Sequence, residues 1–213
     1  MTKILFLPGA GGSAGFWRPV AERLAEGQNH PALSASADFL SNPVFLSWPG
    51  LGAEAAEPQI QGMDDLVSRT CAHMDEPVDL VAQSMGGLVA LKATLKRPHC
   101  VRRMVLVATS GGVPVADLGG ADWRTDYYAA FPHAARWIGA AHEDLSPRLG
   151  EITMPVLLLW GDADPISPPA IGQRLQHLLP NARLHVISGG DHDLAQTHAG
   201  PAAALIRAHL ANI

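Results

Sequence analysis

The chain has 213 residues, of which 47% are hydrophobic and 16% are charged, and its formal net charge at pH 7 is −5. This length suits one sizeable core, so we expect a single α/β domain over residues 1–213. The negative charge, without a cluster of lysine and arginine, argues against nucleic-acid binding. No apolar run approaches the roughly 18 residues of a membrane span, and residues 4–7 are too few for a signal peptide. Cys71 and Cys100 lack metal-ligand spacing, which predicts reduced thiols and a cytoplasmic protein.

Short apolar runs alternate with amphipathic segments along the chain. Strands are predicted at residues 3–7, 43–47, 78–82, 103–108, 155–160 and 182–187. Helices are predicted at residues 16–24, 62–74, 88–95, 171–179 and 202–210. This alternation indicates a mostly parallel sheet of about six strands, with right-handed crossovers and helices on both faces. Residues 27–42 carry little signal and are interpreted as a connector or a short surface helix.

The segment from about residue 113 to 148, called the cap segment below, breaks this rhythm. It holds both tyrosines of the chain, and Trp123, Tyr127 and Phe131 recur every four residues, as on one face of a short helix. We expect this segment to form a short helical cap over the carboxyl edge of the sheet. Trp123, Tyr127, Phe131 and Trp137 would then line an apolar substrate pocket. The simpler alternative is that these aromatic side chains only anchor the segment to the body of the protein.

Ser84 lies between a predicted strand and a predicted helix. Small residues stand two places away on each side, Ala82 and Gly86, which is a variant of the pattern G-x-S-x-G. Such a tight strand-to-helix turn holds the serine in a strained backbone conformation and places its hydroxyl beside the positive end of the helix. The alternative is a serine that merely caps the helix.

A serine hydroxyl is a weak nucleophile, so this turn predicts a base and an orienting acid elsewhere in the chain. The carboxyl ends of parallel strands meet at one edge of a sheet, and two further loops reach that edge. Asp164 follows the strand at 155–160, and His192 follows the strand at 182–187. Asp162 is an alternative acid. A metal site is a weaker alternative, with the ligands Asp191, His192, Asp193 and His198.

A glycine-rich loop at residues 8–13 joins the first strand to the first helix. Gly9-x-Gly11-x-x-Ala14 loosely matches a dinucleotide-binding pattern, but no acidic residue closes a second strand about twenty residues on. The loop is better suited to aiming a backbone N–H at an oxyanion. We therefore expect the backbone N–H groups of Ala10 and Met85 to form an oxyanion hole.

These motifs together resemble the α/β-hydrolase-fold serine hydrolases over nearly the full chain. The family's oxyanion-loop pattern, HGxxGS followed by tryptophan, is matched by residues 8–13 and Trp17, except that Pro8 replaces the histidine. We expect this replacement to leave the loop less fixed. The family's PGxG turn corresponds to residues 49–52, and its WGxxDxxxP loop corresponds to residues 160–168, which makes Asp164 the acid.

The resemblance implies a fold and an activity. The fold is the α/β-hydrolase fold with a reduced sheet of about six strands, because the chain starts on the oxyanion-loop strand. The activity is hydrolysis of small or medium carboxylic esters through an acyl-enzyme, with Ser84 as nucleophile, His192 as base and no metal or cofactor. Serine at position 84 argues against dehalogenase and epoxide-hydrolase chemistry, which uses an aspartate nucleophile.

Several alternatives to ester hydrolysis stay open. Thioester hydrolysis and carbon–carbon bond hydrolysis use the same serine chemistry. A non-catalytic small-ligand receptor or scaffold is the alternative from another class, because a fold does not determine a function. As partners we expect a small-molecule ester or thioester, no nucleic acid and no membrane. An exposed edge strand would allow a homodimer.

Overall fold

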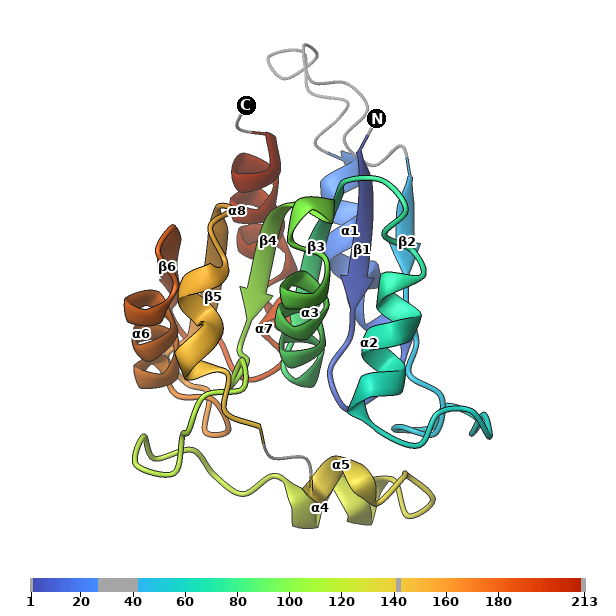
Figure 1. Ribbon diagram of the computed structural model, residues 1–213. Coiled ribbons are helices and arrows are strands. Elements are labelled where there is room, and N and C mark those ends of the chain that lie inside the picture. Colours follow the sequence, from blue (N-terminus) through green and yellow to red (C-terminus); the bar gives the residue numbers. More distant parts are fainter. Residues whose placement is uncertain (1, 27–41, 141–142, 212–213) are drawn as a thin grey trace.

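The computed structural model describes residues 2–26, 42–140 and 143–211 (Figure 1). Its centre is a six-stranded sheet in the order β2-β1-β3-β4-β5-β6, with every neighbouring pair parallel. The strands are β1 (Lys3–Leu7), β2 (Pro43–Phe45), β3 (Val78–Gln83), β4 (Val101–Val107), β5 (Val156–Gly161) and β6 (Ala182–Ile187). The predicted six-stranded parallel sheet is confirmed.

Helices cover both faces of this sheet (Figure 1). One face packs against α2 (Met63–Cys71), α3 (Met85–Lys96) and α6 (Pro169–Leu178), and the other against α1 (Arg18–Glu26), α7 (Leu194–Thr197) and α8 (Ala199–Ala211). Because successive strand side chains point to opposite faces, Leu80 and Ala82 of β3 join the first core and Val81 joins the second. Within the described ranges, no helix has the length and apolar character to cross a membrane.

Four helices begin earlier than the sequence predicts, among them α6 at Pro169 and α8 at Ala199. The helix expected at 16–24 starts as a 3₁₀ turn, η1 (Ala14–Trp17), and continues as α1. Helix α3 starts at Met85 although Gly86 and Gly87 have low helix propensity. Close contacts with other segments require glycine at both positions. A Cβ on Gly86 would stand 2.8 Å from the carbonyl oxygen of Leu7, so only glycine lets α3 lie this close to β1. The predicted connector at 27–42 lies, except for its last residue, outside the described residues.

The cap segment leaves the sheet after β4 and lies across the carboxyl ends of the strands (Figure 1). It contains the short helices α4 (Arg124–Ala130) and α5 (Trp137–Ala140), and the 3₁₀ turn η5 (Ser146–Glu151) leads back to the sheet. The ring centroid of Tyr127 lies 5.4 Å from that of Trp123 and 5.3 Å from that of Phe131. The three rings therefore pack against one another along one side of α4, as their spacing predicts.

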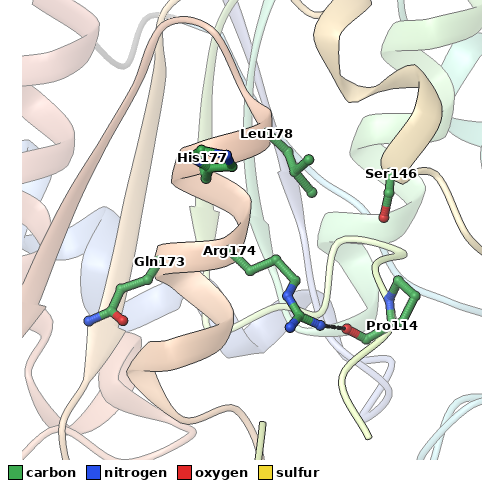
Figure 2. A pocket seen from close by; sticks show the side chains of 6 residues that line it. All are labelled: Pro114, Ser146, Gln173, Arg174, His177 and Leu178. Carbon is green, nitrogen blue, oxygen red and sulfur yellow. Dashed lines mark hydrogen bonds between the residues drawn. The ribbon is translucent and has the colours of Figure 1, made fainter. Parts of the chain in front are cut away.

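The start of the cap segment is fastened to α6 by Arg174. Its guanidinium donates to the carbonyl oxygen of Pro114 (2.6 Å) and pairs with the carboxylate of Asp117 (2.7 Å). Figure 2 shows the first of these contacts at the side of a hollow of about 540 Å³. The hollow is lined by Pro114, Ser146, Gln173, Arg174, His177 and Leu178. None of these lining residues belongs to the site predicted from the sequence, so this hollow is separate from it.

Candidate active site

Ser84 directly follows β3 and is the N-cap residue of α3. Its backbone angles, φ 51° and ψ −124°, are ones that residues other than glycine rarely adopt. Two hydrogen bonds from the adjacent strand end hold it there: its N–H donates to Val107 O (2.9 Å), and its carbonyl accepts from the hydroxyl of Thr109 (2.6 Å). The Ser84 hydroxyl makes no capping bond to any described helix N–H, so the helix-cap alternative does not account for this residue.

The side chains of Ser84, His192 and Asp164 form a continuous line of hydrogen bonds. Nε2 of His192 lies 3.0 Å from Oγ of Ser84, and Nδ1 lies 2.8 Å from Oδ2 of Asp164. The three residues come from loops that follow β3, β6 and β5, so the carboxyl edge of the sheet brings them together. This is the set that the sequence predicts as nucleophile, base and acid, and it suits proton transfer from the serine to the imidazole.

Asp164 is 4% exposed, and both of its carboxylate oxygens are used. Oδ1 accepts from the backbone N–H groups of Ile166 (2.8 Å) and Ser167 (2.9 Å), while Oδ2 faces His192. The contacts that shape the turn and the contact that orients the imidazole thus use different oxygens of one carboxylate. Because the backbone fixes Oδ1, the carboxylate cannot rotate away from the imidazole.

Asp162, the alternative acid, has a partner other than the histidine ring. Its Oδ1 accepts from the N–H of Gly189 (2.6 Å) on the loop after β6. Ala163 adds a second tie, because its N–H donates to Gly190 O (2.9 Å). Asp162 therefore holds the two loops together, and it is Asp164 that contacts the imidazole.

The residues of the alternative metal site include Asp191, whose carboxylate forms hydrogen bonds within the protein. Oδ1 of Asp191 accepts from the N–H of Asp193 (3.1 Å) and from the hydroxyl of Thr197 (3.1 Å). Burial raises the pKa of Asp193, and the neighbouring imidazole of His192 opposes that shift. Both ring nitrogens of His192 already have partners. In the part of the chain that the structure describes, no three His, Cys, Asp or Glu residues are grouped to hold a metal ion.

The two expected oxyanion donors lie on the helix that follows Ser84 and on the loop after β1. The N–H of Met85 is the first of α3, and Ala10 lies in the loop after β1. That loop runs close to the serine, since a Cβ on Gly9 would stand 3.0 Å from Cβ of Ser84. No described atom accepts a hydrogen bond from the N–H of Ala10 or Met85, which leaves both groups free to bind an oxyanion.

Two tryptophans hold the loop after β1. Nε1 of Trp17 donates to Leu7 O (3.0 Å), and Nε1 of Trp48 donates to Pro8 O (2.7 Å). Both tryptophans are fully buried. Indole donors from η1 and from the segment after β2 thus hold carbonyl groups at the start of this loop, a support that the expectation of a less fixed loop did not include.

Two polar side chains that support the site are not predicted from the sequence. The amide of Gln83, buried at the end of β3, donates to the carbonyl oxygen of His192 (3.2 Å). The hydroxyl of Thr109 fixes Ser84 as described above, and a Cβ on Gly87 would lie 2.5 Å from it. The usable signal is a polar residue at the end of an otherwise apolar strand, since burial there requires a hydrogen-bond partner.

The four aromatic residues predicted to line a substrate pocket do not share one environment: Trp137 lines a hollow, and the other three pack against one another. Trp137 lines a hollow of about 440 Å³ between α2, α3 and α5, together with Leu88 and Met63. Its described lining residues do not include Ser84, Asp164 or His192. Trp123 and Phe131 flank the ring of Tyr127, whose hydroxyl contacts backbone atoms. The hydroxyl of Tyr127 is thus already paired within the protein.

Comparison with known proteins identifies the family. The sequence profile of the Alpha/beta hydrolase family matches residues 4–151, and a profile described as alpha/beta hydrolase fold matches residues 116–199. The chain therefore belongs to the alpha/beta hydrolase family. A thermophilic esterase from Thermogutta terrifontis shares the fold, with a TM-score of 0.74 and 18% identity over 98% of this chain and 89% of that chain.

Two curated relatives extend this comparison. A pimeloyl-[acyl-carrier protein] methyl ester esterase from Neisseria meningitidis is 31% identical, and the match covers 75% of this chain and 65% of that protein. The chain thus spans slightly less than two thirds of this relative. A 2-hydroxy-6-oxononadienedioate/2-hydroxy-6-oxononatrienedioate hydrolase from Dechloromonas aromatica is 24% identical, and the match covers 90% of this chain and 79% of that protein. Both relatives are hydrolases.

Proposed function

We propose that this protein is a serine hydrolase that cleaves carboxylic esters through an acyl-enzyme. The observation that carries the proposal is the continuous contact from Asp164 through His192 to a strained Ser84, with distances of 2.8 and 3.0 Å. A buried acid, an oriented imidazole and an aimed hydroxyl are the three parts that activate a serine nucleophile.

The proposed reaction has two halves. Oγ of Ser84 attacks the ester carbonyl while Nε2 of His192 takes the hydroxyl proton, and Asp164 stabilises the imidazolium. The N–H groups of Ala10 and Met85 hold the tetrahedral oxyanion, and loss of one such donor typically costs roughly 10²–10³-fold in kcat. His192 then protonates the leaving alcohol, and the acyl group stays on Ser84. A water molecule, deprotonated by His192, releases the acid and restores the serine.

Small or medium esters are the proposed substrates. The methyl ester esterase among the relatives supports this choice, whereas the oxononadienedioate hydrolase supports carbon–carbon bond cleavage as the second candidate. Thioesters remain a third candidate within the same mechanism. The cap segment is proposed to cover the site within a single domain, with Trp123, Tyr127, Phe131 and Trp137 around the substrate. A cytoplasmic location and the absence of a cofactor stay predictions.

Turnover of p-nitrophenyl esters from acetyl to octanoyl, beside the matching thioesters, tests the proposal. We expect many turnovers per protein on at least one ester, and background rates for Ser84→Ala. A protein that binds these compounds stoichiometrically without releasing product would instead be a receptor. Equal turnover by the wild type and Ser84→Ala would contradict the proposed mechanism.

A further inference from the structure

Four consecutive backbone carbonyls in residues 7–10 each accept a hydrogen bond. Three of the donors belong to the body of the fold: the two buried indoles described above and the N–H of Gly12, which lies 3.1 Å from Gly9 O. The fourth donor comes from the cap segment, where the hydroxyl of Tyr127 in α4 donates to Ala10 O (2.8 Å). The residue that carries a proposed oxyanion donor is thus held by a side chain 117 positions away in the sequence.

The hydroxyl of Tyr127 has a defined direction. It accepts a hydrogen bond from the N–H of Gly52 (2.9 Å), so its own proton is directed to Ala10 O. Burial raises the pKa of Tyr127, which keeps the hydroxyl protonated. The ring packs between Trp123 and Phe131, and this limits its movement.

The turn at residues 49–52 contacts both the cap segment and the loop after β1. Gly52 has a φ of +55°, and a Cβ there would stand 3.1 Å from Cα of Gly11. Ala135 of the cap segment adds a further bond, because its N–H donates to Gly50 O (2.8 Å). The cap segment, this turn and the loop after β1 therefore form one hydrogen-bonded unit.

We infer that Tyr127 is a positioning residue that orients the oxyanion hole through the backbone of Ala10. The N–H of Ala10 shares a peptide plane with Gly9 O, which the N–H of Gly12 holds, and Tyr127 holds the next peptide plane through Ala10 O. With both planes fixed, Ala10 keeps one conformation, so the direction of its N–H is set before substrate binds. The inference rests on the proposed function, because only a reaction that forms an oxyanion needs this N–H. It gives Tyr127 a role in transition-state stabilisation in place of polar contact with the substrate.

Tyr127→Phe tests this role because it removes only the hydroxyl. Tyr128→Phe is a matched control: its hydroxyl also bridges two backbone groups, donating to Arg136 O (3.2 Å) and accepting from the N–H of Gly139 (3.2 Å), both inside the cap segment. On the best p-nitrophenyl ester, we expect Tyr127→Phe to lower kcat by about tenfold, a fraction of the loss for a deleted oxyanion donor. KM should change by less than about twofold, and Tyr128→Phe should match the wild type in both constants.

A trifluoromethyl ketone provides the second readout, because its adduct with a serine carries the oxyanion. We expect its inhibition constant to rise about tenfold in Tyr127→Phe, in step with the loss of kcat, and to stay unchanged in Tyr128→Phe. A Tyr127→Phe variant with lowered Tm or raised KM but wild-type kcat and inhibition constant would overturn the inference. Failure of the proposed function is distinguishable, since Ser84→Ala would then keep the turnover and ketone binding of the wild type.

Discussion

The carboxylate of Asp164 contacts the imidazole of His192 with one oxygen only. The other oxygen is held by two backbone N–H groups, so this side chain has a single orientation. The arrangement separates two tasks within one carboxylate: Oδ1 shapes its own loop, and Oδ2 selects the ring orientation and tautomer of His192. A charge at this position, rather than a carbonyl oxygen alone, is what the proposed mechanism requires.

Asp164→Asn is expected to lower kcat/KM by roughly 10⁴-fold while the protein stays folded. The asparagine carbonyl would keep the backbone bonds of Oδ1, and its NH₂ group would face Nδ1 of His192, favouring the wrong tautomer. Asp162→Asn is the control, because an amide oxygen can still accept from Gly189 N–H. Steady-state kinetics and circular dichroism of both variants give the comparison. A larger loss of kcat/KM in Asp162→Asn than in Asp164→Asn would show that Asp164 is not the orienting acid.

Gly86→Ala should lower the free energy of unfolding by about 1–3 kcal/mol, as overpacking does. The added methyl group would press on the carbonyl oxygens of Pro8 and Leu7, where α3 lies against the loop after β1. Gly11→Ala in that same loop is the control, because no described atom lies within 4 Å of its added Cβ. Urea unfolding of the two variants measures the difference. Equal stability of both would contradict the close approach of helix and loop.

The stability of the protein should fall between pH 6.5 and pH 4, in part through His209 in α8. Burial, followed by the nearby charge of Arg103, lowers the pKa of His209 from 6.5 to about 4. In this window the unfolded chain binds a proton at this position and the folded chain does not, so acidification favours unfolding. His209→Gln should show a smaller loss of unfolding free energy over the same window. The exposed His99→Gln should follow the wild type, and a His209→Gln curve parallel to wild type would refute the prediction.

Local sequence patterns were sufficient to predict six strands, their parallel direction and the grouping of Ser84, Asp164 and His192 at one edge of the sheet. Buried strands are short apolar runs in the sequence, and the loops that follow parallel strands lie together at the carboxyl edge of the sheet. Helix α3 starts at Met85 although glycine at 86 and 87 disfavours a helix. Both glycines are needed because a larger residue would collide with the end of β1 or with Thr109. Such contacts between distant segments leave no periodic signal.

The support of the loop after β1 could not be predicted for the same reason. Pro8 departs from the family pattern, which suggests a looser loop, yet Trp48 supplies a donor to its carbonyl from 40 positions away. The spacing of Trp123, Tyr127 and Phe131 predicts a shared helix face, and the structure confirms it. It does not reveal that the hydroxyl of Tyr127 reaches Ala10, since that contact depends on where the cap segment lies on the body.

Labelling with a fluorophosphonate probe tests the central claim most directly. The probe phosphonylates an activated serine, so the site of the adduct, located by mass spectrometry, identifies the nucleophile without knowledge of the substrate. The proposed mechanism predicts a single adduct on Ser84, with labelling abolished in Ser84→Ala and strongly slowed when His192 is replaced by alanine. An adduct on another residue, or equal labelling of the wild type and Ser84→Ala, would contradict the assignment of Ser84 as the nucleophile.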